Sequence, residues 1–435
     1  MDVTITPHKL EGVVPAIASK SMAHRLLILS AISPGITNIN CNTTSLDIDA
    51  TVRCLEALGA RVAKTKLGFR VVPIPGTSES DNILQPHKHA LLDCGESGST
   101  LRFMLPLCAA LGCDAKLTGH GRLSKRPLSP LFEQLEDHGA KLSEQGVFPL
   151  SVEGRLRPGR FVLPGNVSSQ FTSGLLMAAP LLSSPIEVVV SEPVESRSYI
   201  DMTVKALEAF GIHVGVSSET IDGIHSAVYT VTPGDGIASP GTVSVEGDWS
   251  NAAFWLASGA IGGYVVVTGL DTQSAQGDRA ILACLAALGA RVGRGARKAS
   301  AQHDKLSGRT IDVSEIPDLA APLAAVAAYS SGTTRIANAG RLRLKESDRL
   351  ESITAALSAM GSDVSIDSDS LVICGRRLSG GTVDAANDHR IAMMAAIAAA
   401  YATGPTTIRD AECVAKSYPR FFEDFRSLGG QAKEG

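Results

Sequence analysis

One amphipathic pattern, closed by glycine, recurs six times along the chain. In its first copy, Ile48, Val52, Leu55 and Leu58 fall at helical spacing and form one apolar stripe. Glycine readily takes the left-handed conformation that ends a helix, so the glycine closing each copy marks a helix end. We therefore predict six surface helices, each followed by a strand. The copies begin at Asp47, Leu128, Tyr199, Asp278, Asp348 and Tyr418, and their closing glycines are Gly59, Gly139, Gly211, Gly289, Gly361 and Gly429.

A second kind of helix, apolar nearly all round, is predicted before each amphipathic copy. A helix that is apolar on every face belongs in a protein core. The repeating unit is then a buried helix, a glycine turn, one or more strands, an amphipathic helix and another strand. The closing glycines recur roughly every 70 to 80 residues, which suits a small α/β unit better than a solenoid repeat. The six apolar sequences are HRLLILSAI, LRFMLPLCAAL, TSGLLMAAPLL, NAAFWLASGAI, LAAPLAAVAAY and RIAMMAAIAAAYA.

Six such units in 435 residues suggest two domains of three units each. The stretch TPGDGIASPG, residues 232–241, is rich in proline and glycine and lies between the third and fourth units, so we predict the crossover there. Domain I is expected to comprise residues 1–18 and 242–435, and domain II residues 19–241. A cleft between the domains is the expected substrate site. The fold class is α/β (α+β).

Composition narrows the function. The chain has 40 Lys and Arg against 44 Asp and Glu, a net charge of -4, which gives no general attraction to nucleic acid or to an anionic membrane. Its eight cysteines include no C-x-x-C pair, so we expect reduced, mostly buried thiols and no metal site. The first residues, MDVTITPHKL, have neither a basic start nor an apolar core of a signal peptide, so a cytoplasmic location is expected.

Polar residues and cations gather where the six apolar helices begin. The starts read SKSMAHR, GESGSTLR, NVSSQ, GDWSN, EIPD and NDHR. Backbone N–H groups at a helix start bind anions, although side-chain capping alone would explain any one of these segments. The nearby cations lie in Gly-, Ser- and Pro-rich turns, a pattern that suits recognition of two or more phosphates or carboxylates. These cations are Lys20, Arg25, Arg102, Arg122, Lys125, Arg126, Arg341, Arg343, Lys345, Arg349, Arg390 and Lys416.

Acids placed among these cations are candidates for proton transfer. Asp318 and Asp388 could instead cap helices, and Glu346 could form a simple ion pair. His389 is as readily a structural hydrogen-bonding residue as a catalytic one. Lys20 is also a candidate, because a lysine surrounded by other cations loses its proton more easily.

Other anion chemistries do not fit the sequence. The chain contains no G-x-x-x-x-G-K-[ST] segment, which leaves a P-loop kinase or ATPase without support. GDGIASPG lacks the spacing of a dinucleotide-binding G-x-G-x-x-G. GESGS resembles the nucleophile elbow G-x-S-x-G, but Ser99 stands where its second glycine should be.

Ten ordered motifs together resemble the 5-enolpyruvylshikimate-3-phosphate synthase family over essentially the whole chain. The resemblance implies a two-domain inverted α/β barrel of six βαβαββ repeats. It also implies transfer of the enolpyruvyl group of phosphoenolpyruvate to the 5-hydroxyl of shikimate-3-phosphate, with release of phosphate. No cofactor or metal is implied, glyphosate is a possible inhibitor, and a monomer is expected. The motifs are SKSMAHR, GESGSTLR, SKRP, GNVSSQFTSGLLMAAP, SRSYID, VEGDWS, IPD, LKESDR, NDHR and AKSYP.

The resemblance also implies roles for individual residues. Asp318 would orient the attacking hydroxyl and act as its base, while Glu346 and Lys20 would deliver and remove the proton at the methylene carbon. Asp47 would have a structural role. Asp388 lies in the NDHR motif, beside Arg390. Implied contacts of shikimate-3-phosphate are Lys20, Ser21, Arg25, Ser168, Ser169, Gln170, Ser196, Tyr199, Asp318 and Lys345. Implied contacts of phosphoenolpyruvate are Lys20, Gly98, Arg126, Gln170, Arg349, Arg390 and Lys416.

Two positions depart from the family pattern, and two other functions stay open. Glu96 and Arg341 each stand where many members have Asn, and Glu96 would repel a carboxylate unless a cation pairs with it. One alternative is the sister enzyme that uses UDP-N-acetylglucosamine, which carries a cysteine in a loop that reads GRLSKRPLSP here, without cysteine. The other is an inactive anion-binding protein of the same fold. The argument against it is that four residues are intact: Lys20, Asp318, Glu346 and Lys416.

Overall fold

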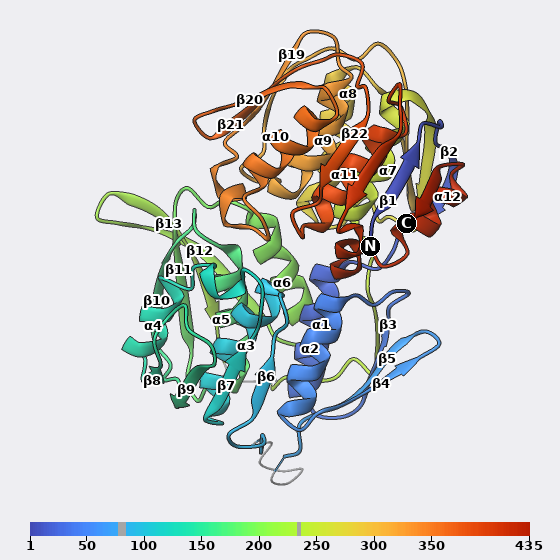
Figure 1. Cartoon of the computed structure of the whole chain (residues 1–435). Coiled ribbons are helices and arrows are strands. Elements are labelled where there is room, and N and C mark those ends of the chain that lie inside the picture. The colour runs from blue at the N-terminus through green and yellow to red at the C-terminus, as the bar shows by residue number, and fades with distance from the viewer. Residues whose placement is uncertain (77–83, 233–235) are drawn as a thin grey trace. The chain divides into compact units, whose positions relative to one another are not determined.

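The computed structural model describes residues 1–76, 84–232 and 236–435, so residues 233–235 of the predicted crossover lie outside the described part (Figure 1). The chain forms two compact units. Unit 1 comprises Met1–Ser19 and Glu246–Gly435, and unit 2 comprises Lys20–Val245. The chain thus passes from unit 2 back to unit 1 after residue 245, whereas the sequence analysis placed this boundary after residue 241. The difference arises because strand β14 (Thr242–Ser244) pairs with β3 (Thr37–Asn40) inside unit 2.

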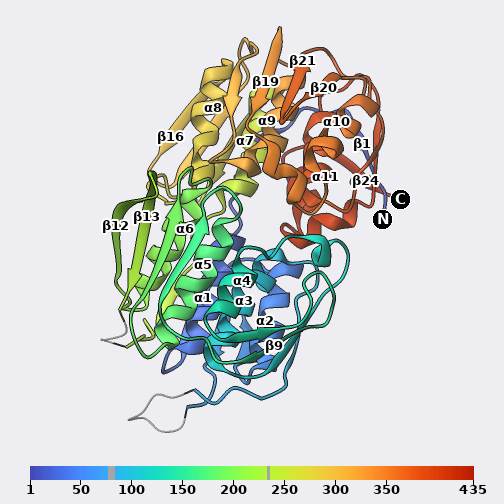
Figure 2. The same cartoon turned by 90° about the vertical axis from the view of Figure 1, so that its left-hand side faces the viewer.

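The two predicted kinds of helix are confirmed in both units. In each unit the three apolar helices pack on one another, and the amphipathic helices follow them in chain order (Figure 2). The apolar helices are α1 (Lys20–Ile32), α3 (Gly98–Leu111), α5 (Ser169–Ala178), α7 (Trp249–Gly262), α9 (Ala320–Ala328) and α11 (His389–Ala399). The amphipathic helices are α2 (Leu46–Ala57), α4 (Leu131–Asp137), α6 (Arg197–Ala209), α8 (Ile281–Leu288), α10 (Arg349–Ala359) and α12 (Phe421–Ser427).

Burial explains why these segments are helices of two kinds. Every residue of α11 is buried, as expected for a helix that is apolar all round. In α2 the predicted stripe is buried, with Ile48 and Leu55 fully inaccessible, while the opposite face meets solvent. Each buried Leu or Ile side chain contributes about 1.5–3 kcal/mol to stability, so the stripe fixes which face of the helix turns inward.

Each unit contains three four-stranded sheets with one shared topology. In unit 2 the strand orders are β14-β3-β5-β4, β6-β7-β9-β8 and β10-β11-β13-β12. The first two strands of each sheet are parallel and the others antiparallel. The remaining strands are β4 (Arg61–Thr65), β5 (Gly68–Val72), β6 (Leu91–Asp93), β7 (Ala115–Thr118), β8 (Ala140–Leu142), β9 (Leu150–Gly154), β10 (Arg160–Pro164), β11 (Ile186–Ser191), β12 (Val214–Ile221) and β13 (Ile224–Val231).

Unit 1 repeats this pattern as β2-β15-β17-β16, β18-β19-β21-β20 and β22-β23-β1-β24. The predicted α/β fold of six repeats, three in each unit, is thereby confirmed. The strands are β1 (Val3–Thr6), β2 (Glu11–Pro15), β15 (Tyr264–Thr268), β16 (Arg291–Gly295), β17 (Lys298–Gln302), β18 (Thr310–Asp312), β19 (Thr333–Ala337), β20 (Asp363–Asp367), β21 (Ser370–Cys374), β22 (Gly381–Asp384), β23 (Thr406–Arg409) and β24 (Gln431–Glu434).

Two strands pair in one unit but lead into a helix of the other. β2 pairs in parallel with β15 of unit 1, yet the chain continues from it into α1 of unit 2. β14 pairs in parallel with β3 of unit 2, yet the chain continues from it into α7 of unit 1. The two crossings run side by side, since the Ser19 backbone N–H donates to the Glu246 carbonyl oxygen over 2.8 Å.

The chain's first strand completes its last repeat. β1 pairs antiparallel with both β23 and β24, and Val3 lies opposite Glu434. In Figure 1 the blue strand β1 accordingly lies among red elements. Unit 1 is therefore built from both ends of the chain, whereas unit 2 is one continuous segment.

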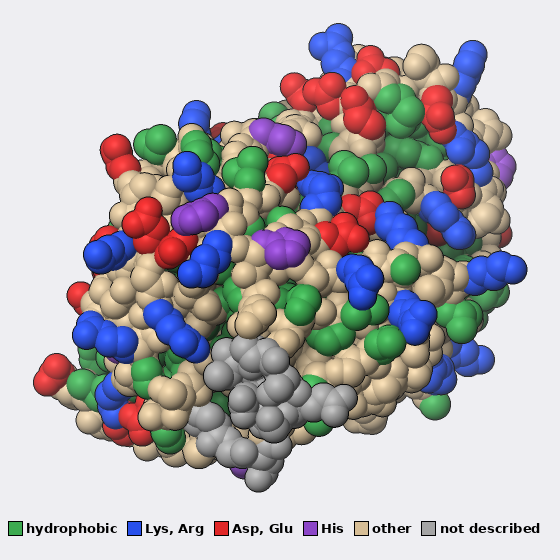
Figure 3. Space-filling view, turned by 90° about the horizontal axis from the view of Figure 1, so that it is seen from below, with side chains coloured by type: hydrophobic (Ala, Val, Ile, Leu, Met, Phe, Trp, Pro, Cys, Tyr) green, Lys and Arg blue, Asp and Glu red, His purple; other side chains and the backbone are tan. Residues whose placement is uncertain are grey.

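Several expectations about composition can be compared with the described residues. Among these residues no helix is long and apolar enough to cross a membrane, and no group of three or more His, Cys, Asp or Glu is arranged to hold a metal ion. All eight cysteines are free thiols, and six of them are buried. Figure 3 shows Lys and Arg interspersed with Asp and Glu over the visible face, which therefore carries no extended basic patch.

Candidate active site

Side-chain caps begin four of the six apolar helices. In unit 2, Ser97 accepts a hydrogen bond from the Thr100 N–H, and Ser168 accepts one from the Gln170 N–H. In unit 1, Asp248 and Asp388 cap α7 and α11 in the same way. The capping interpretation is thus confirmed for Asp388. Asp318 lies instead inside the short 3-10 helix η4 (Pro317–Leu319).

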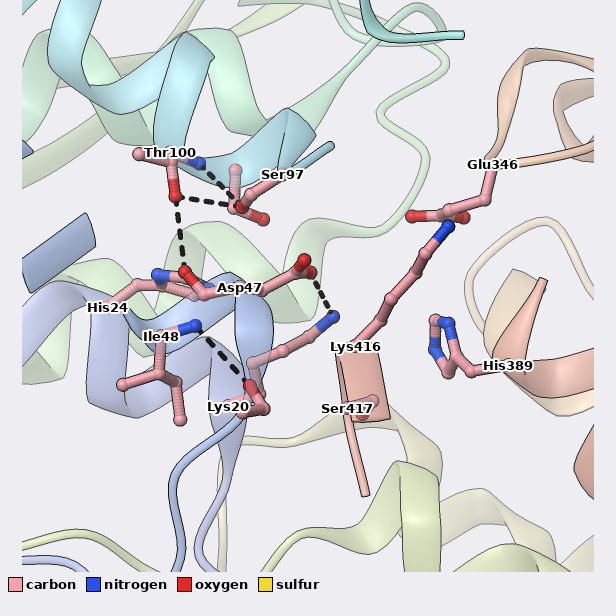
Figure 4. A network of polar contacts seen from close by, with 12 residues as sticks. Lys20, His24, Asp47, Ile48, Ser97, Thr100, Glu346, His389, Lys416 and Ser417 are labelled. Carbon is pink, nitrogen blue, oxygen red and sulfur yellow. Dashed lines mark hydrogen bonds and ion pairs between the residues drawn. The ribbon is translucent and has the colours of Figure 1, made fainter. Parts of the chain in front are cut away.

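Lys20, the first residue of α1, forms a short ion pair in unit 2. Its Nζ atom lies 2.7 Å from Asp47 Oδ2 on α2, and both side chains are largely buried (Figure 4). The backbone carbonyl of Asp47 in turn lies 3.5 Å from the Thr100 hydroxyl, which donates to Ser97 over 2.8 Å. The start of α2 thus presents a carboxylate to Lys20. Asp47 therefore orients the ammonium group.

His24 connects α1 to α2 inside the core. Its Nδ1 atom lies 2.7 Å from the Thr51 hydroxyl, and the side chain is fully buried. Burial, and then the nearby charges of Lys20 and Arg25, hold the pKa of His24 well below its usual value. The imidazole is therefore neutral at physiological pH. No sequence pattern singles out this histidine, because it lies within an apolar helix.

Arg25 is buried between α1 and α6. Its Nε donates to the Thr203 hydroxyl over 2.8 Å, and its terminal nitrogens donate to the carbonyl oxygens of Ser21 and Tyr199 over 2.6 and 2.9 Å. Burial lowers the pKa of Arg25 to about 10. The predicted residues Ser21, Arg25 and Tyr199 are thus brought together, but through backbone oxygens. Ser196, at the start of α6, takes a left-handed conformation with φ of 58°.

Gln170 has a fixed orientation at the start of α5. Its Oε1 accepts from Arg102 Nη1 over 2.7 Å, and its Nε2 donates to the Ser99 hydroxyl over 2.8 Å. Arg102 also donates to the Pro127 carbonyl oxygen over 2.9 Å, which connects α3 to the SKRP segment. Arg102 was recognised in the sequence as a cation but not assigned to the site. The arginine in GESGSTLR is the signal for it.

Gly98 begins α3 directly against Arg126. A Cβ atom at position 98 would collide with the Arg126 guanidinium. Only glycine therefore leaves Arg126 in this place, where 9% of that residue is exposed. Gly98 and Arg126 were both predicted site residues, and the structure brings them into contact.

Glu96, one of the two departures from the family pattern, lies near a histidine. Its Oε1 atom is 3.7 Å from His120 Nδ1. The other departure, Arg341, lies in the 3-10 helix η5 (Gly340–Leu344), and its charge acts on the nearby Lys345.

In unit 1, Asp318 lies among three cations. One carboxylate oxygen, Oδ1, is 3.0 Å from Arg349 Nη1 and 3.5 Å from Lys345 Nζ, and the other, Oδ2, is 3.2 Å from Arg390 Nη2. Burial acts to raise the pKa of Asp318, but the charges of its three partners outweigh burial and hold that pKa well below its usual value. The carboxylate is therefore ionised.

Arg349 contacts three carboxylates at once. Its Nε is 2.8 Å from Asp388 Oδ2, its Nη2 is 2.6 Å from Glu346 Oε2, and its Nη1 reaches Asp318. Burial alone would lower the pKa of Arg349, yet the three acids raise it above its usual value. The ion-pair interpretation of Glu346 is confirmed. Arg349 is consequently the group that joins η4, α10 and the start of α11.

The other two predicted cations of unit 1 differ in their surroundings. Burial is the main cause that lowers the pKa of Lys345 to about 8, with Asp318 opposing it. Lys416 ends the 3-10 helix η6 (Ala411–Lys416) and donates to the Asn387 carbonyl oxygen over 2.7 Å. Lys345 can therefore change charge near neutral pH.

One acid near this cluster was missed by the sequence interpretation. Asp278 lies in the 3-10 helix η3 (Gly277–Ala280), just before α8, and only 4% of it is exposed. The sequence interpretation treated it as the start of an amphipathic helix. Burial, and then the charge of Asp318, raise the pKa of Asp278 to about 7. No sequence pattern marks such a residue, because its environment arises from packing of η3 against α7.

Comparisons with known proteins identify the family. The family model described as EPSP synthase (3-phosphoshikimate 1-carboxyvinyltransferase) matches residues 5–425. A 3-phosphoshikimate 1-carboxyvinyltransferase from Clostridium kluyveri is 42% identical, with 99% of this chain and 98% of the relative covered. A protein of the same name from Clostridioides difficile is 38% identical over 99% of this chain and 98% of its own length.

Solved structures give the same result. An EPSP synthase from Acinetobacter baumannii superposes with a TM-score of 0.79 and 25% identity, covering 100% of both chains. The enolpyruvyl transferase NikO from Streptomyces tendae shares the fold at 18% identity, with a TM-score of 0.75 over 99% of this chain and 98% of its own. The resemblance read from ten motifs is thereby confirmed, and the chain belongs to the EPSP synthase (3-phosphoshikimate 1-carboxyvinyltransferase) family.

Proposed function

We infer that this chain transfers the enolpyruvyl group of phosphoenolpyruvate to the 5-hydroxyl of shikimate-3-phosphate and releases phosphate. The observation that carries the inference is Asp318, a largely buried carboxylate kept ionised among three cations, inside a chain that matches the family over nearly its whole length. An ionised acid beside cations can accept a hydroxyl proton while those cations bind the anionic partner.

We assign Asp318 as the base for the attacking hydroxyl. In the substrate-free protein its low pKa makes it a weak base, because three cations stabilise its charge. Phosphoenolpyruvate bound to Arg349 and Arg390 would partly neutralise those cations. The pKa of Asp318 would then rise toward the range in which a carboxylate accepts protons efficiently. Substrate binding would thus strengthen the base that the reaction needs.

We assign proton exchange at the methylene carbon to Lys20 and Glu346. In the addition step the hydroxyl oxygen bonds to the substituted enol carbon, the hydroxyl proton passes to Asp318, and the methylene carbon gains a proton. In the elimination step the resulting methyl group loses a proton and phosphate leaves with the electron pair of its C–O bond. The ion pair of Lys20 with Asp47 supports this assignment, because it fixes the direction of a proton-carrying ammonium group.

Substrate contacts are assigned to residues of both units. For shikimate-3-phosphate we propose the polar starts of α1, α5 and α6 in unit 2 and Lys345 in unit 1. For phosphoenolpyruvate we propose Arg126 beside Gly98, Gln170 with its fixed amide, and Arg349, Arg390 and Lys416. The contacts are Lys20, Ser21, Arg25, Ser168, Ser169, Gln170, Ser196, Tyr199, Asp318 and Lys345 for the first substrate.

The acceptor specificity can be tested by phosphate release. With phosphoenolpyruvate present, shikimate-3-phosphate should give stoichiometric phosphate and UDP-N-acetylglucosamine should give none above background. The loop GRLSKRPLSP lacks the cysteine of the sister enzyme, which is the reason to expect this difference. Phosphate release with UDP-N-acetylglucosamine alone would assign the chain to the sister reaction, and release with neither acceptor would favour the inactive anion-binding protein.

A substitution at Gly98 should weaken phosphoenolpyruvate binding selectively. In Gly98→Ala the new methyl group displaces the Arg126 guanidinium. Loss of one charged hydrogen bond costs about 1.5–3 kcal/mol, so KM for phosphoenolpyruvate should rise roughly 10- to 100-fold. Steady-state kinetics with each substrate varied would measure this. Gly215→Ala is the matched control, because a Cβ there makes only ordinary contacts. Equal KM values in both variants would remove Arg126 from the proposed site.

A further inference from the structure

Lys416, a proposed phosphoenolpyruvate contact, lies where regular secondary structure stops. It is the last residue of η6, and the next residue, Ser417, has a φ of -134° and a ψ of -39°, which continue no helix. The backbone N–H groups of Ser417 and Tyr418 both donate to the Val414 carbonyl oxygen, over 3.1 and 2.7 Å. A 3-10 turn is held only weakly by its own hydrogen bonds. The position of Lys416 therefore depends on the tertiary contacts of the residues that follow it.

The first of these contacts comes from the start of α7. Asn251 Nδ2 donates to the Ser417 hydroxyl oxygen over 3.1 Å, and both residues are buried. Asn251 is itself fixed, because its backbone N–H donates to Asp248 Oδ1 over 2.7 Å in the cap of α7. The amide that holds Ser417 thus projects from a capped turn of a core helix.

A second contact comes from Trp255, one helical turn after Asn251. Its indole Nε1 donates to the Tyr418 hydroxyl oxygen over 3.2 Å. An indole N–H can only donate, so the hydroxyl hydrogen of Tyr418 goes to Asp424 Oδ2, which accepts it over 2.6 Å. The Trp255 ring also stacks on Phe421, with 4.7 Å between the ring centroids. Two side chains of α7, one turn apart, therefore hold the two consecutive residues after Lys416.

The ammonium group of Lys416 has a partner on a different element. Its Nζ donates over 2.7 Å to the carbonyl oxygen of Asn387, which has a left-handed φ of 53° directly before the Asp388 cap of α11. Figure 4 shows the Lys416 side chain extending away from Ser417. Contacts at both ends restrict a four-carbon stem that is otherwise flexible, and such restriction pre-organises a charged group for its ligand.

We propose that Asn251 and Trp255 are positioning residues for Lys416. They act through the two residues that follow it in the chain, and not on the substrate itself. The proposal rests on the proposed function, in which Lys416 binds phosphoenolpyruvate. Loss of binding that is equal in the ground and transition states raises KM and leaves kcat unchanged. The expected signature is a higher KM for phosphoenolpyruvate, with kcat and the KM for shikimate-3-phosphate preserved.

Asn251→Ala should raise KM for phosphoenolpyruvate about 3- to 10-fold, the factor that corresponds to losing one buried neutral hydrogen bond. Ser417→Ala breaks the same hydrogen bond from its other side and should give the same rise, which keeps the test decisive if one of the two variants does not fold. Ser417→Thr keeps the hydroxyl and should restore the parental KM. Trp255→Phe keeps a ring against Phe421 but loses the N–H group, and should also raise this KM. Steady-state kinetics with each substrate varied would measure these values.

A double-mutant cycle with Lys416→Met separates positioning from general weakening of the unit. Lys416→Met alone should raise KM for phosphoenolpyruvate roughly 10- to 100-fold, as for loss of one charged hydrogen bond. In that background Asn251→Ala and Trp255→Phe should add less than about twofold, because the group that they position is gone. A purely structural role would add the same factor in both backgrounds.

Ser258→Ala is the matched control for the α7 variants. Ser258 lies on the same helix, is buried, and shares a hydrogen bond of 3.1 Å with the Tyr401 hydroxyl. It has no printed place in the contacts around Lys416, so this variant should keep the parental KM for both substrates. Thermal unfolding followed by circular dichroism checks that each variant is folded at the assay temperature.

The outcomes distinguish this proposal from the proposed function. If Lys416→Met leaves KM for phosphoenolpyruvate unchanged, Lys416 is not a substrate contact and the assignment of the site fails first. If Lys416→Met raises this KM but Asn251→Ala and Ser417→Ala keep the parental value, the positioning role is refuted and the role of Lys416 stands. An equal rise from Asn251→Ala with and without Lys416 would refute the positioning role in the same way.

Discussion

Replacing Asp318 by asparagine is expected to lower kcat by about 10²- to 10⁴-fold, the usual contribution of a positioned general base. The amide cannot accept the hydroxyl proton, although it fills the same space beside Arg349 and Arg390. Binding of shikimate-3-phosphate should weaken by a much smaller factor, because its other proposed contacts remain. Rapid-quench or steady-state kinetics give kcat, and equilibrium titration with shikimate-3-phosphate gives the binding constant.

Glu346→Gln should resemble Asp318→Asn, with a large loss of kcat and a small loss of affinity for shikimate-3-phosphate. The control is Asp367→Asn, since Asp367 is an exposed acid of the same unit that pairs with Arg335 at the surface. Parental turnover in the Asp318 and Glu346 variants would contradict both proton-transfer assignments. A loss confined to binding would make Asp318 a substrate contact only.

Arg349→Met should lower the free energy of unfolding of unit 1 by about 3–5 kcal/mol, the usual cost of removing one partner from a buried ion pair. The substitution leaves the fully buried Asp388 carboxylate without its guanidinium partner, and it also removes a partner of Asp318 and Glu346. Both tryptophans of the chain, Trp249 and Trp255, are buried in α7 of unit 1. Urea unfolding followed by their fluorescence therefore reports on the affected unit.

The sign of the pH dependence gives a second check on Arg349. Charge pairing with Arg349 opposes the effect of burial and keeps the pKa of Asp388 and Asp318 below its usual value. This stabilisation is present above pH 4 and is lost as pH falls through the folded-state pKa. The difference between Arg349→Met and the parent should then be largest near pH 7 and shrink toward pH 3. Arg349→Lys keeps the positive charge but loses the planar guanidinium group. Its free energy of unfolding should therefore lie between those of the parent and of Arg349→Met. Parental stability of the Met variant would refute the role of this ion-pair network.

The repeat itself was predictable from sequence because it rests on local rules. Apolar positions at helical spacing and closing glycines identified all twelve α-helices of the described residues, including α2 with its stripe from Ile48 to Leu55. The strand partners were not predictable in the same way. The pairing of β14 with β3, or of β1 with β24, depends on contacts between residues about 200 and 430 positions apart, for which no local pattern exists.

The candidate site likewise combines features that the sequence predicts with features that only packing creates. Cations in turns and acids among them pointed to Asp318 and Arg349, and the structure brings these two side chains together. The partners that set their chemistry were harder to foresee. The ion pair between Lys20 and Asp47 joins two helices, and the environment of Asp278 arises only when η3 packs against α7. Burial and distance, which decide a pKa, are properties of packing rather than of a motif.

β2 and β14 each pair in one unit and lead into a helix of the other. This connectivity affects the order in which the two units can fold during synthesis. Unit 2 is continuous from Lys20 to Val245, so the ribosome can release a complete unit before the rest of the chain exists. Unit 1 must keep β1 and β2 unpaired until β15, β23 and β24 have been made. Because β1 and β24 pair side by side, a circular permutant that joins the two ends and opens at residues 19 and 20 would make unit 1 a continuous segment as well. Unit 2 can thus fold early, whereas unit 1 leaves the edges of β1 and β2 unpaired until their partner strands have been made. Unpaired strand edges are prone to aggregation and are the kind of surface that chaperones bind.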